Sequence, residues 1–394
     1  MTILRRLLVG LGIALPVVAI ILFFGVARIG GARFNRVDDT KGIVVSERAR
    51  TLHQSLLVAD LHNDLLLWDR NPVQLGMWGH TDVTRLVEGN VAIQVFSTVT
   101  KGPKNQNYER NSADSDNITL LAVLSRWPRR TWNSRLQRAL YQADKLDHAA
   151  AISEGRLVVA HTAAELRKAL DFRAGTPGIK PVIGVLSTEG LHAIDGDLAS
   201  LDTLFAHGFR MAGLAHFFDN DVSGSAHGEA KGGLTPLGRR VVERMQALGM
   251  IVDLAHVSPQ GFTETLAVTT KPVVVSHTGV QATCAGPRNL SDDQLRALGA
   301  RGALIGIGFW NGAVCDASPH AIAKAIRHAV NVAGLSNVAL GSDWDGATTV
   351  AFGADQVSQL TEALLQAGFS EAEIRAVMGE NTARFLLANL PPGR

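Results

Sequence analysis

The sequence predicts an α/β protein, a (β/α)8 barrel of the TIM type with an N-terminal transmembrane segment and a long insertion after the second strand. Short Val-, Ile- and Leu-rich runs bounded by turn residues recur along the chain, as in buried parallel strands. Helical patterns lie between several runs, and eight such repeats favour closure into a barrel. The expected strands are 56–62, 91–98, 182–188, 210–216, 250–256, 272–277, 302–308 and 338–343.

The composition indicates a well-packed globular protein. Of the 394 residues, 46% are hydrophobic and 19% are charged, which excludes a disordered chain. Barrels of this type take about 250 residues and more with insertions, so one barrel domain fits the length. The formal net charge of +2 gives no indication of nucleic-acid binding, and none is expected.

The N-terminus carries an apolar stretch, residues 7–27, that contains no charged side chain. A run of about 20 such residues can cross a membrane. Arg5 and Arg6 precede it as in an export signal, and Gly25 and Ala27 are small enough for signal-peptidase cleavage. The stretch exceeds the roughly 7–15 apolar residues of a signal peptide, so an uncleaved anchor is favoured over a signal or a buried helix.

These features divide the chain into an anchor or signal (1–30), a linker (31–45) and a barrel (46–394) with an insertion (100–181). We expect the barrel to lie in the periplasm or outside the cell, at a bacterial inner membrane. Basic residues flank the apolar stretch on both sides, so the positive-inside rule does not decide the orientation.

Capping residues define several helices in order along the barrel. A helix at 46–55 leads into the first strand. The segment 235–249 has an N-cap threonine, a proline in its first turn and a terminal glycine. Segments 258–268 and 291–299 each begin with a capping serine. Two further helical stretches, 355–368 and 371–390, close the fold.

The insertion is expected to be a polar loop followed by a largely helical segment from Pro128 to residue 152, a short strand at 157–161 and a helix from Thr162. Long insertions in barrel loops often form lids or oligomer contacts. Its arginines are expected to form a solvated helix face and not a nucleic-acid surface, because acidic residues follow them. They are Arg126, Arg129, Arg130, Arg135 and Arg138.

The chain contains two cysteines, Cys284 and Cys315, without the CxxC spacing of a thiolate zinc site. A disulfide between them is possible, but the sequence does not require it.

Six of the apolar runs end in side chains that bind metals or transfer protons. His62 and Asp64 lie two apart at a strand end, so both leave on the same face and can bind one cation. Glu189 follows another strand; it could cap a helix, or its two oxygens could bridge two metals about 3.5–4 Å apart. His256 and His277 end successive strands and could be core histidines or ligands.

The remaining candidates have two interpretations each. His216 could be a ligand or a donor to a developing oxyanion. Asp253 could orient a neighbouring group or cap a turn. Asp343 ends the last strand, where it could take the proton of an attacking water, and Asp345 is expected to be structural. Arg288 could be an ordinary loop residue or bind a carboxylate, with Asn289 tying the loop. The other histidines receive no chemical role.

Because the carboxyl ends of barrel strands meet at one rim, these side chains are expected to converge there. Imidazoles and carboxylates together predict a dinuclear site, most naturally with two Zn²⁺ per chain. A hydroxide bridging the metals would attack a carbonyl that one of them polarises.

The chain resembles the membrane dipeptidase family of zinc peptidases from about residue 50 to about residue 390. The similar segments are ADLHNDLL, STEGLHAI, FRMAGLAHFFDND, GLTPLGRRVVERMQALGMIVDLAHVS, PVVVSHTGVQATCAGPRNLSDD and VALGSDWDG.

The resemblance implies a dinuclear zinc barrel that hydrolyses dipeptides, including those with a C-terminal D-residue. It implies that His62 and Asp64 bind one zinc, that His256 and His277 bind the other, and that Glu189 bridges them. It further implies that His216 contacts the substrate carbonyl, that Arg288 binds the substrate carboxylate and that Asp343 serves the amino group and the reacting water. Relatives are often dimers, so a homodimer is possible.

The chain departs from the family pattern at three places near the site. Leu191 stands where a second glycine is common after the bridging glutamate, Pro287 precedes Arg288 where a second arginine is frequent, and Phe309–Asn311 occupies the place of a pocket tyrosine. Substrate preference is therefore open. The alternatives are a barrel metallohydrolase acting on a non-peptide amide or lactone, and a catalytically silent anchored peptide-binding protein.

Overall fold

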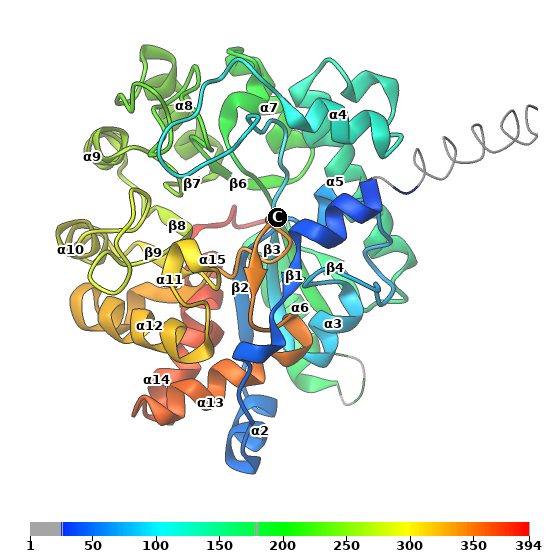
Figure 1. Cartoon of the computed structure of the whole chain (residues 1–394), viewed down its shortest axis with the longest axis vertical. Coiled ribbons are helices and arrows are strands. Elements are labelled where there is room, and N and C mark those ends of the chain that lie inside the picture. The colour runs from blue at the N-terminus through cyan, green and yellow to red at the C-terminus, as the bar shows by residue number, and fades with distance from the viewer. Residues whose placement is uncertain (1–24, 26, 177, 179, 394) are drawn as a thin grey trace, which may run out of the picture.

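The computed structural model describes residues 25, 27–176, 178 and 180–393, and eight parallel strands in it form a closed barrel. The hydrogen-bonded order is β3-β2-β10-β9-β8-β7-β6-β5, and pairing of β3 with β5 closes the ring (Figure 1). The strands are β2(Val58–Asn63), β3(Val91–Phe96), β5(Val182–Thr188), β6(Phe209–Gly213), β7(Ile251–Asp253), β8(Val274–Thr278), β9(Leu304–Ile307) and β10(Val338–Leu340). All eight predicted strands are confirmed, although several are shorter than expected.

The barrel strands are buried on both sides. Their inward-facing aliphatic side chains, such as Leu61, Ile93 and Val185, have no exposed surface. A second apolar layer, which includes Val242, Leu298 and Ile326, joins the strands to the surrounding helices. Each such side chain contributes about 1.5–3 kcal/mol by leaving water, so the helices cannot separate from the barrel without a large loss.

Helices cover the outside of the barrel (Figure 1). They are α2(Glu47–Gln54), α3(Val83–Glu88), α4(Asn117–Leu124), α5(Arg135–Ile152), α6(Ala163–Gly175), α7(Leu198–Ala206), α8(Pro236–Leu248), α9(Pro259–Val268), α10(Asp292–Ala300), α11(Asn311–Val314), α12(Pro319–Ala333), α13(Ser358–Gln366), α14(Glu371–Arg375) and α15(Asn381–Asn389). Every helix that the sequence predicted is present. The predicted C-terminal helix 371–390 is interrupted between α14 and α15 by a π-helical turn, Ala376–Glu380, with a kink at Gly379.

The capping chemistry places the helix ends as expected. Thr235 Oγ1 accepts a hydrogen bond from the Gly238 amide at the start of α8, and Gly249 ends the helix in the left-handed region with φ of 77°. Ser258 and Ser291 cap α9 and α10 in the same way. These caps explain why the strand-to-helix turns could be located from the sequence.

The insertion contains one short strand, β4(Leu157–Val159), which pairs outside the ring with β5. It also contains α4, which the sequence analysis treated as part of a polar loop. Asp116 caps α4 by accepting from the Ile118 amide. The helix is apolar on all sides, so it lacks the alternation of apolar and polar faces that would have identified it.

The prediction that the arginines of the insertion form a solvated face is wrong for Arg138, which is only 2% exposed. Its guanidinium pairs with Asp116 at 2.6 Å and donates to the Thr100 and Thr131 carbonyls, both at 2.7 Å. Arg138 therefore ties α5 to the loop that follows β3. Arg126, Arg129 and Arg130 are exposed, as expected.

The end of the predicted anchor and the start of the linker are docked on the barrel. Residues 27–34 are helical, and β1(Arg36–Val37) pairs in parallel with β11(Thr349–Val350) beyond the end of β10. The predicted span itself lies almost entirely outside the described residues. Among the residues that are described, no helix is both long enough and apolar enough for a membrane span.

Candidate metal centre

The predicted site residues converge at the carboxyl ends of the barrel strands. His62 and His277 are each the second-to-last residue of their strands, β2 and β8, and Asp64 follows β2 directly. Glu189, His216, His256 and Asp343 each follow a strand within three residues, from β5, β6, β7 and β10. All seven side chains are buried, with 1–6% of their surface exposed.

Glu189 is the centre of the cluster. Its Oε1 lies 2.9 Å from His256 Nε2, 3.2 Å from His277 Nε2 and 3.7 Å from His62 Nε2. Its Oε2 lies 3.3 Å from His216 Nε2. One carboxylate thus faces four imidazoles, which is the position that a bridging ligand requires.

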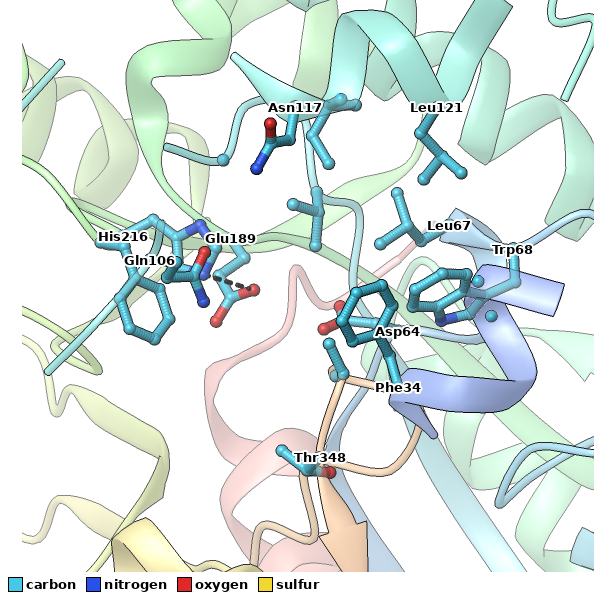
Figure 2. Close-up of a pocket in the computed structure, with 18 of the residues that line it drawn as sticks. Phe34, Asp64, Leu67, Trp68, Gln106, Asn117, Leu121, Glu189, His216 and Thr348 are labelled. Atoms are coloured by element: carbon cyan, nitrogen blue, oxygen red, sulfur yellow. Dashed lines mark ion pairs between the residues drawn. The ribbon is translucent and has the colours of Figure 1, made fainter. Parts of the chain in front are cut away.

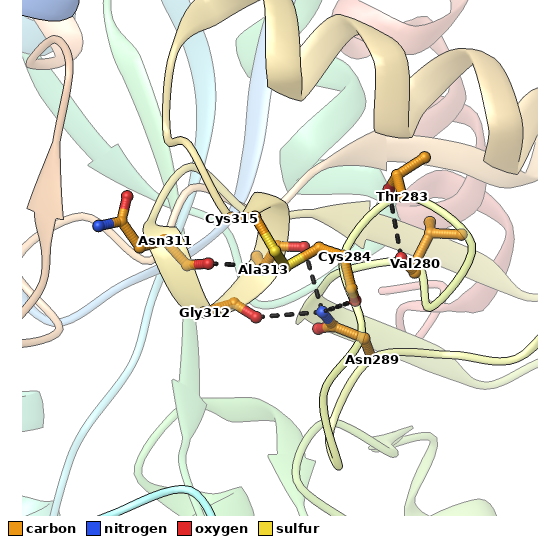
Figure 3. Close-up of a disulfide and its surroundings, with 8 residues drawn as sticks. All are labelled: Val280, Thr283, Cys284, Asn289, Asn311, Gly312, Ala313 and Cys315. Atoms are coloured by element: carbon orange, nitrogen blue, oxygen red, sulfur yellow. Dashed lines mark hydrogen bonds between the residues drawn. A yellow bond between two sulfur atoms is a disulfide. The ribbon is translucent and has the colours of Figure 1, made fainter.

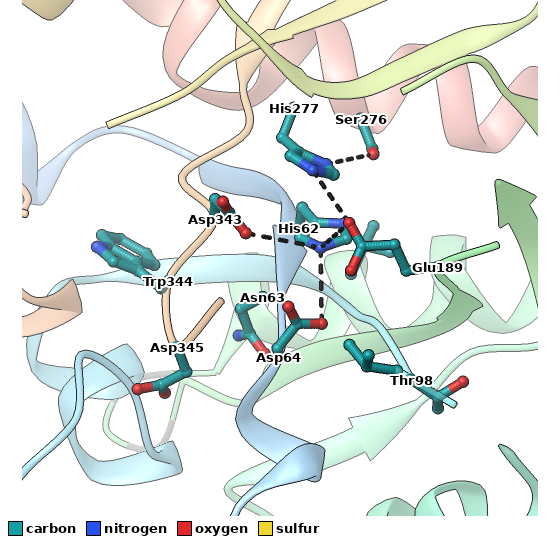
Figure 4. Close-up of polar contacts among 12 residues, drawn as sticks. His62, Asn63, Asp64, Thr98, Glu189, Ser276, His277, Asp343, Trp344 and Asp345 are labelled. Atoms are coloured by element: carbon teal, nitrogen blue, oxygen red, sulfur yellow. Dashed lines mark hydrogen bonds and ion pairs between the residues drawn. The ribbon is translucent and has the colours of Figure 1, made fainter. Parts of the chain in front are cut away.

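His62 lies between three carboxylates, as Figure 4 shows. In addition to Glu189, its Nε2 is 3.6 Å from Asp64 Oδ1 and 3.9 Å from Asp343 Oδ1. Three sets of side chains in the described part of the chain are close enough together to hold a metal ion: His62, Glu189 and His277; His62, Asp64 and Asp343; and Glu189, His216 and His256. Because the last set includes His216, that residue is near enough to be a ligand as well as a substrate contact.

A short hydrogen-bonded relay fixes the protonation of His277. Ser276 Oγ donates its one proton to Asp253 Oδ2 at 2.5 Å, so toward His277 Nδ1, 2.9 Å away, it can only accept. Nδ1 of His277 therefore carries the hydrogen, and Nε2 presents a lone pair to the cluster. Both interpretations of Asp253 are therefore borne out, because its Oδ1 also accepts from the Ala255 amide at 3.0 Å in a turn while its Oδ2 holds Ser276.

The electrostatics of the cluster show a shortage of positive charge. Burial raises the pKa of Glu189 well above its usual value, and the Asp64 carboxylate adds to that rise. Burial likewise raises the pKa of Asp343 to about 7. For His62, burial favours the neutral ring, but the carboxylates of Glu189 and Asp64 outweigh this and raise its pKa to about 10. A divalent cation would supply the missing charge.

Burial keeps the other imidazoles neutral. It lowers the pKa of His256 and of His277 well below the ordinary value. The positive charge of Arg288 lowers the pKa of His256 further, and that of His62 lowers the pKa of His277 further. The Nε2 atoms of these two buried rings lie 3.0 Å apart. Neutral imidazole is the form that binds zinc.

Buried polar atoms without partners are a further indication that the cluster suits a metal ion. Within the described chain, the buried atoms without any hydrogen-bond partner include both ring nitrogens of His62, Asp64 Oδ1 and His256 Nδ1. Buried polar atoms are normally paired, and an unpaired group costs about 1–3 kcal/mol. Nitrogen and carboxylate donors in this arrangement suit zinc or a similar borderline cation.

The backbone is strained where it delivers two of these side chains. His256 and Asp343 adopt left-handed conformations with φ of 63° and 60°, which are unfavourable for residues other than glycine. Gly190 has φ of 89°, and a Cβ there would approach the His192 ring to 2.5 Å and His216 Cβ to 3.1 Å. Glycine is therefore required directly after Glu189.

Arg288 lies at the edge of the cluster. Its guanidinium donates to the His277 carbonyl at 2.8 Å and stacks over the Trp310 ring at 4.8 Å. In the part of the chain that the structure describes, no carboxylate lies within ion-pair distance of it, although the side chain is buried. A buried cation without a protein counter-ion is suited to an anionic ligand.

The loop that carries Arg288 is held by two links (Figure 3). Cys284 and Cys315 form a disulfide between this loop and the segment after α11. The Asn289 amide donates to the carbonyls of Cys284, Gly312 and Ala313 at 2.8–3.2 Å, which confirms that it ties the loop.

Asp345 is structural, as expected. It is fully buried and accepts from the His80 amide at 2.8 Å and from Thr81 Oγ1 at 2.6 Å, with Arg70 as its ion-pair partner. These bonds join the loop after β10 to the segment before α3.

Three residues near the site carried no recognisable signal in the sequence. The His227 ring lies 5.4 Å from that of His256, and the His192 ring stacks 6.4 Å from that of His216. Tyr108, from the insertion, accepts a hydrogen bond from Trp310 Nε1 at 2.8 Å and holds His227 through its carbonyl. None of them lies within three residues of a strand end, which is why the strand-end pattern did not identify them.

A cavity of about 700 Å³ opens over the cluster. Glu189, His216, His256, Arg288 and Asp343 are among the residues that line it. Figure 2 shows Glu189 and His216 on one side of this cavity and Phe34, Leu67 and Trp68 on the other. The volume lies within the range of small-molecule sites.

Comparisons with known proteins agree with this geometry. The membrane dipeptidase (peptidase family M19) model matches residues 46–389. Dipeptidase tcpJ of Claviceps purpurea (strain 20.1) is 29% identical over 332 residues, which cover 82% of this chain and 72% of that protein.

Two solved structures share the fold along nearly their whole length. The dipeptidase AC, a metallopeptidase of family M19, has a TM-score of 0.69 and 26% identity, covering 86% of this chain and 100% of that one. A metallopeptidase from Rhodobacter sphaeroides, bound to a phosphinate mimic of the dipeptide L-Ala-D-Ala, has a TM-score of 0.68 and 25% identity, covering 85% and 99%. The chain therefore belongs to the membrane dipeptidase family, peptidase family M19, and is a metallo-dipeptidase.

Proposed function

We propose that the protein is a membrane-anchored dipeptidase with two zinc ions, and that Glu189 bridges them. In this proposal His62 and Asp64 bind one ion, and His256 and His277 bind the other. The observation that supports it most is the position of Glu189 Oε1, which faces the Nε2 atoms of three histidines at 2.9–3.7 Å.

When bound, such a metal pair supplies Lewis acidity that activates water and polarises a peptide carbonyl. The protein supplies the remaining functions. Asp343, whose Oδ1 lies 3.9 Å from His62 Nε2 at the strand ends, is placed to accept a proton from water and pass it to the leaving amine. His216, a neutral ring because burial lowers its pKa to about 3, can donate a hydrogen bond to the carbonyl oxygen as negative charge develops there.

Arg288 is proposed to bind the substrate's carboxylate. Its lack of a protein counter-ion among the described residues supports this role, and its stacking on Trp310 fixes the plane of the guanidinium. Acceptance of a C-terminal D-residue is part of the proposal, supported by the L-Ala-D-Ala mimic in the Rhodobacter sphaeroides relative.

The location is also a proposal. We infer that the apolar N-terminal stretch anchors the chain in a bacterial inner membrane with the barrel in the periplasm. The Cys284–Cys315 disulfide supports an oxidising compartment. A homodimer rests on the family resemblance alone, and light scattering of the purified protein in detergent would test it.

The function is tested by hydrolysis assays on the full-length protein with L-Ala-L-Ala and L-Ala-D-Ala. We expect turnover that a chelator abolishes and zinc restores. Arg288→Ala should raise KM for both dipeptides about 10–100-fold, since a hydrogen-bonded charge pair contributes about 1.5–3 kcal/mol. Arg296→Ala, on the exposed surface of α10, is the matched control. No zinc-dependent turnover, or an unchanged KM in Arg288→Ala, would contradict the proposal.

A further inference from the structure

We propose that the outer half of the cavity is a subsite for a large apolar side chain on the N-terminal residue of the dipeptide. This inference rests on the proposed function. It concerns the walls contributed by the segment 27–34 and by α4, neither of which belongs to the barrel repeats.

One side of this outer half is apolar, while Asn105, Gln106 and Asn117 also line the cavity. Phe34, Leu67, Trp68 and Leu121 gather on one side of the cavity in Figure 2, and Ile118 also lines it. Apart from the metal-centre side chains and Arg288, no described lining residue is charged. A substrate with two small side chains would leave these walls in contact with water, whereas an apolar group would displace that water favourably.

The segment 27–34 is held in place firmly enough to form a wall. Gly31 packs on Trp78, where a Cβ would approach the ring to 2.3 Å. Asn35 Oδ1 accepts from the Ala347 amide at 2.9 Å, and the pairing of β1 with β11 continues the attachment. The next helical turn presents Phe34 to the cavity.

Two wall residues are exposed in a way that suits a binding surface. Phe34 is 55% exposed and Leu120 of α4 is 60% exposed, and both line the cavity. Large exposed apolar side chains that are grouped around a pocket mark ligand contact more often than scattered ones do.

The contacts also set the direction in which the substrate lies. Arg288 stacks on Trp310, which contacts Tyr108, and the Tyr108 ring contacts Phe217 beside His216. The carboxylate end of the substrate therefore belongs on that side. Asp64, Leu67 and Trp68 lie on the side of the cavity opposite Glu189 and His216 in Figure 2, so the apolar wall begins on the other side. The side chain nearest those walls is that of the N-terminal residue.

The test compares kcat/KM for two substrates, L-alanyl-D-alanine and L-2-aminodecanoyl-D-alanine, in the full-length zinc-loaded enzyme. We expect the long-chain substrate to be preferred at least tenfold, because a few methylene groups in an apolar pocket give discrimination of that size. Phe34→Ser and Leu120→Ser should each lower this preference about three- to tenfold. The matched controls are Phe172→Ser and Met77→Ser, which remove exposed apolar side chains that do not line the cavity.

The outcomes separate the two proposals. No hydrolysis of either dipeptide would overturn the proposed function and the subsite together. Hydrolysis without preference for the long chain would overturn the subsite and leave the function standing. A preference that survives both wall substitutions, or that falls equally in the controls, would also overturn the subsite.

Discussion

Replacing Ser276 by alanine tests whether the relay from Asp253 to His277 prepares the metal site. The substitution removes the acceptor for the hydrogen on His277 Nδ1, 2.9 Å away, and the donor to Asp253 Oδ2 at 2.5 Å. The imidazole can then carry its hydrogen on Nε2, the atom that faces Glu189. Asp253 keeps its bonds from the amides of Ala255 and Ser276, so its position should persist.

The size of the effect follows from these contacts. Hydrogen-bond partners behind metal ligands typically contribute 10–100-fold to metal affinity, which corresponds to about 1.4–2.7 kcal/mol. A buried group left unpaired costs about 1–3 kcal/mol in stability. We therefore expect Ser276→Ala to bind zinc about 10–100-fold more weakly and to lose about 1–2 kcal/mol of unfolding free energy without metal.

The assay is zinc titration against a competing chelator, together with urea denaturation of the metal-free protein. Ser153→Ala is the matched control: Ser153 is fully buried, and its Oγ donates to the carbonyls of Ala150 at 2.8 Å and Leu157 at 3.2 Å, outside the metal centre. It should lose similar stability with a much smaller change in zinc affinity. Wild-type zinc affinity in Ser276→Ala, or an equal loss in Ser153→Ala, would refute the reasoning.

Three further predictions concern other parts of the molecule. Tyr108→Phe should lower kcat/KM for dipeptides about tenfold, because the buried Trp310 N–H loses its acceptor beside Arg288; unchanged kinetics would contradict this. Replacing Cys284 and Cys315 by serine should cost about 3–4 kcal/mol in urea denaturation, the loop entropy for a separation of 31 residues, and no loss would show that the link is dispensable. Burial lowers the pKa of Lys145 to about 7, whereas the unfolded side chain titrates near 10.4. Between these values the unfolded state binds more protons, so wild-type stability should rise by about 2–3 kcal/mol from pH 6 to pH 9 relative to Lys145→Met, and a fall would contradict the assignment.

The barrel and its metal centre could be predicted because each depends on a local pattern. Buried parallel strands are continuous apolar runs, and their ends are marked by the polar residues that the rim requires. His62, Glu189 and His277 carry that signature individually, and the closed ring brings them together. The capping residues of α8, α9 and α10 fixed the helix starts for the same reason.

The features that the sequence did not predict depend on tertiary contacts, which produce no periodic pattern of residues. Arg138 reads as an exposed arginine in a basic stretch, and only the carbonyls and Asp116 around it explain its burial. Tyr108 and the segment 27–34 reach the cavity from an insertion and from a linker. Tyr108 is positioned by its hydrogen bond with Trp310, and the segment 27–34 is positioned by the pairing of β1 with β11. No local sequence feature predicts either contact.

The central claim is that Glu189 joins two zinc sites, and anomalous diffraction at the zinc edge from crystals grown with zinc tests it most directly. The account predicts two peaks per chain, one beside His62 and Asp64 and one beside His256 and His277, with Glu189 between them. A single peak, or peaks that Glu189 does not contact, would contradict it.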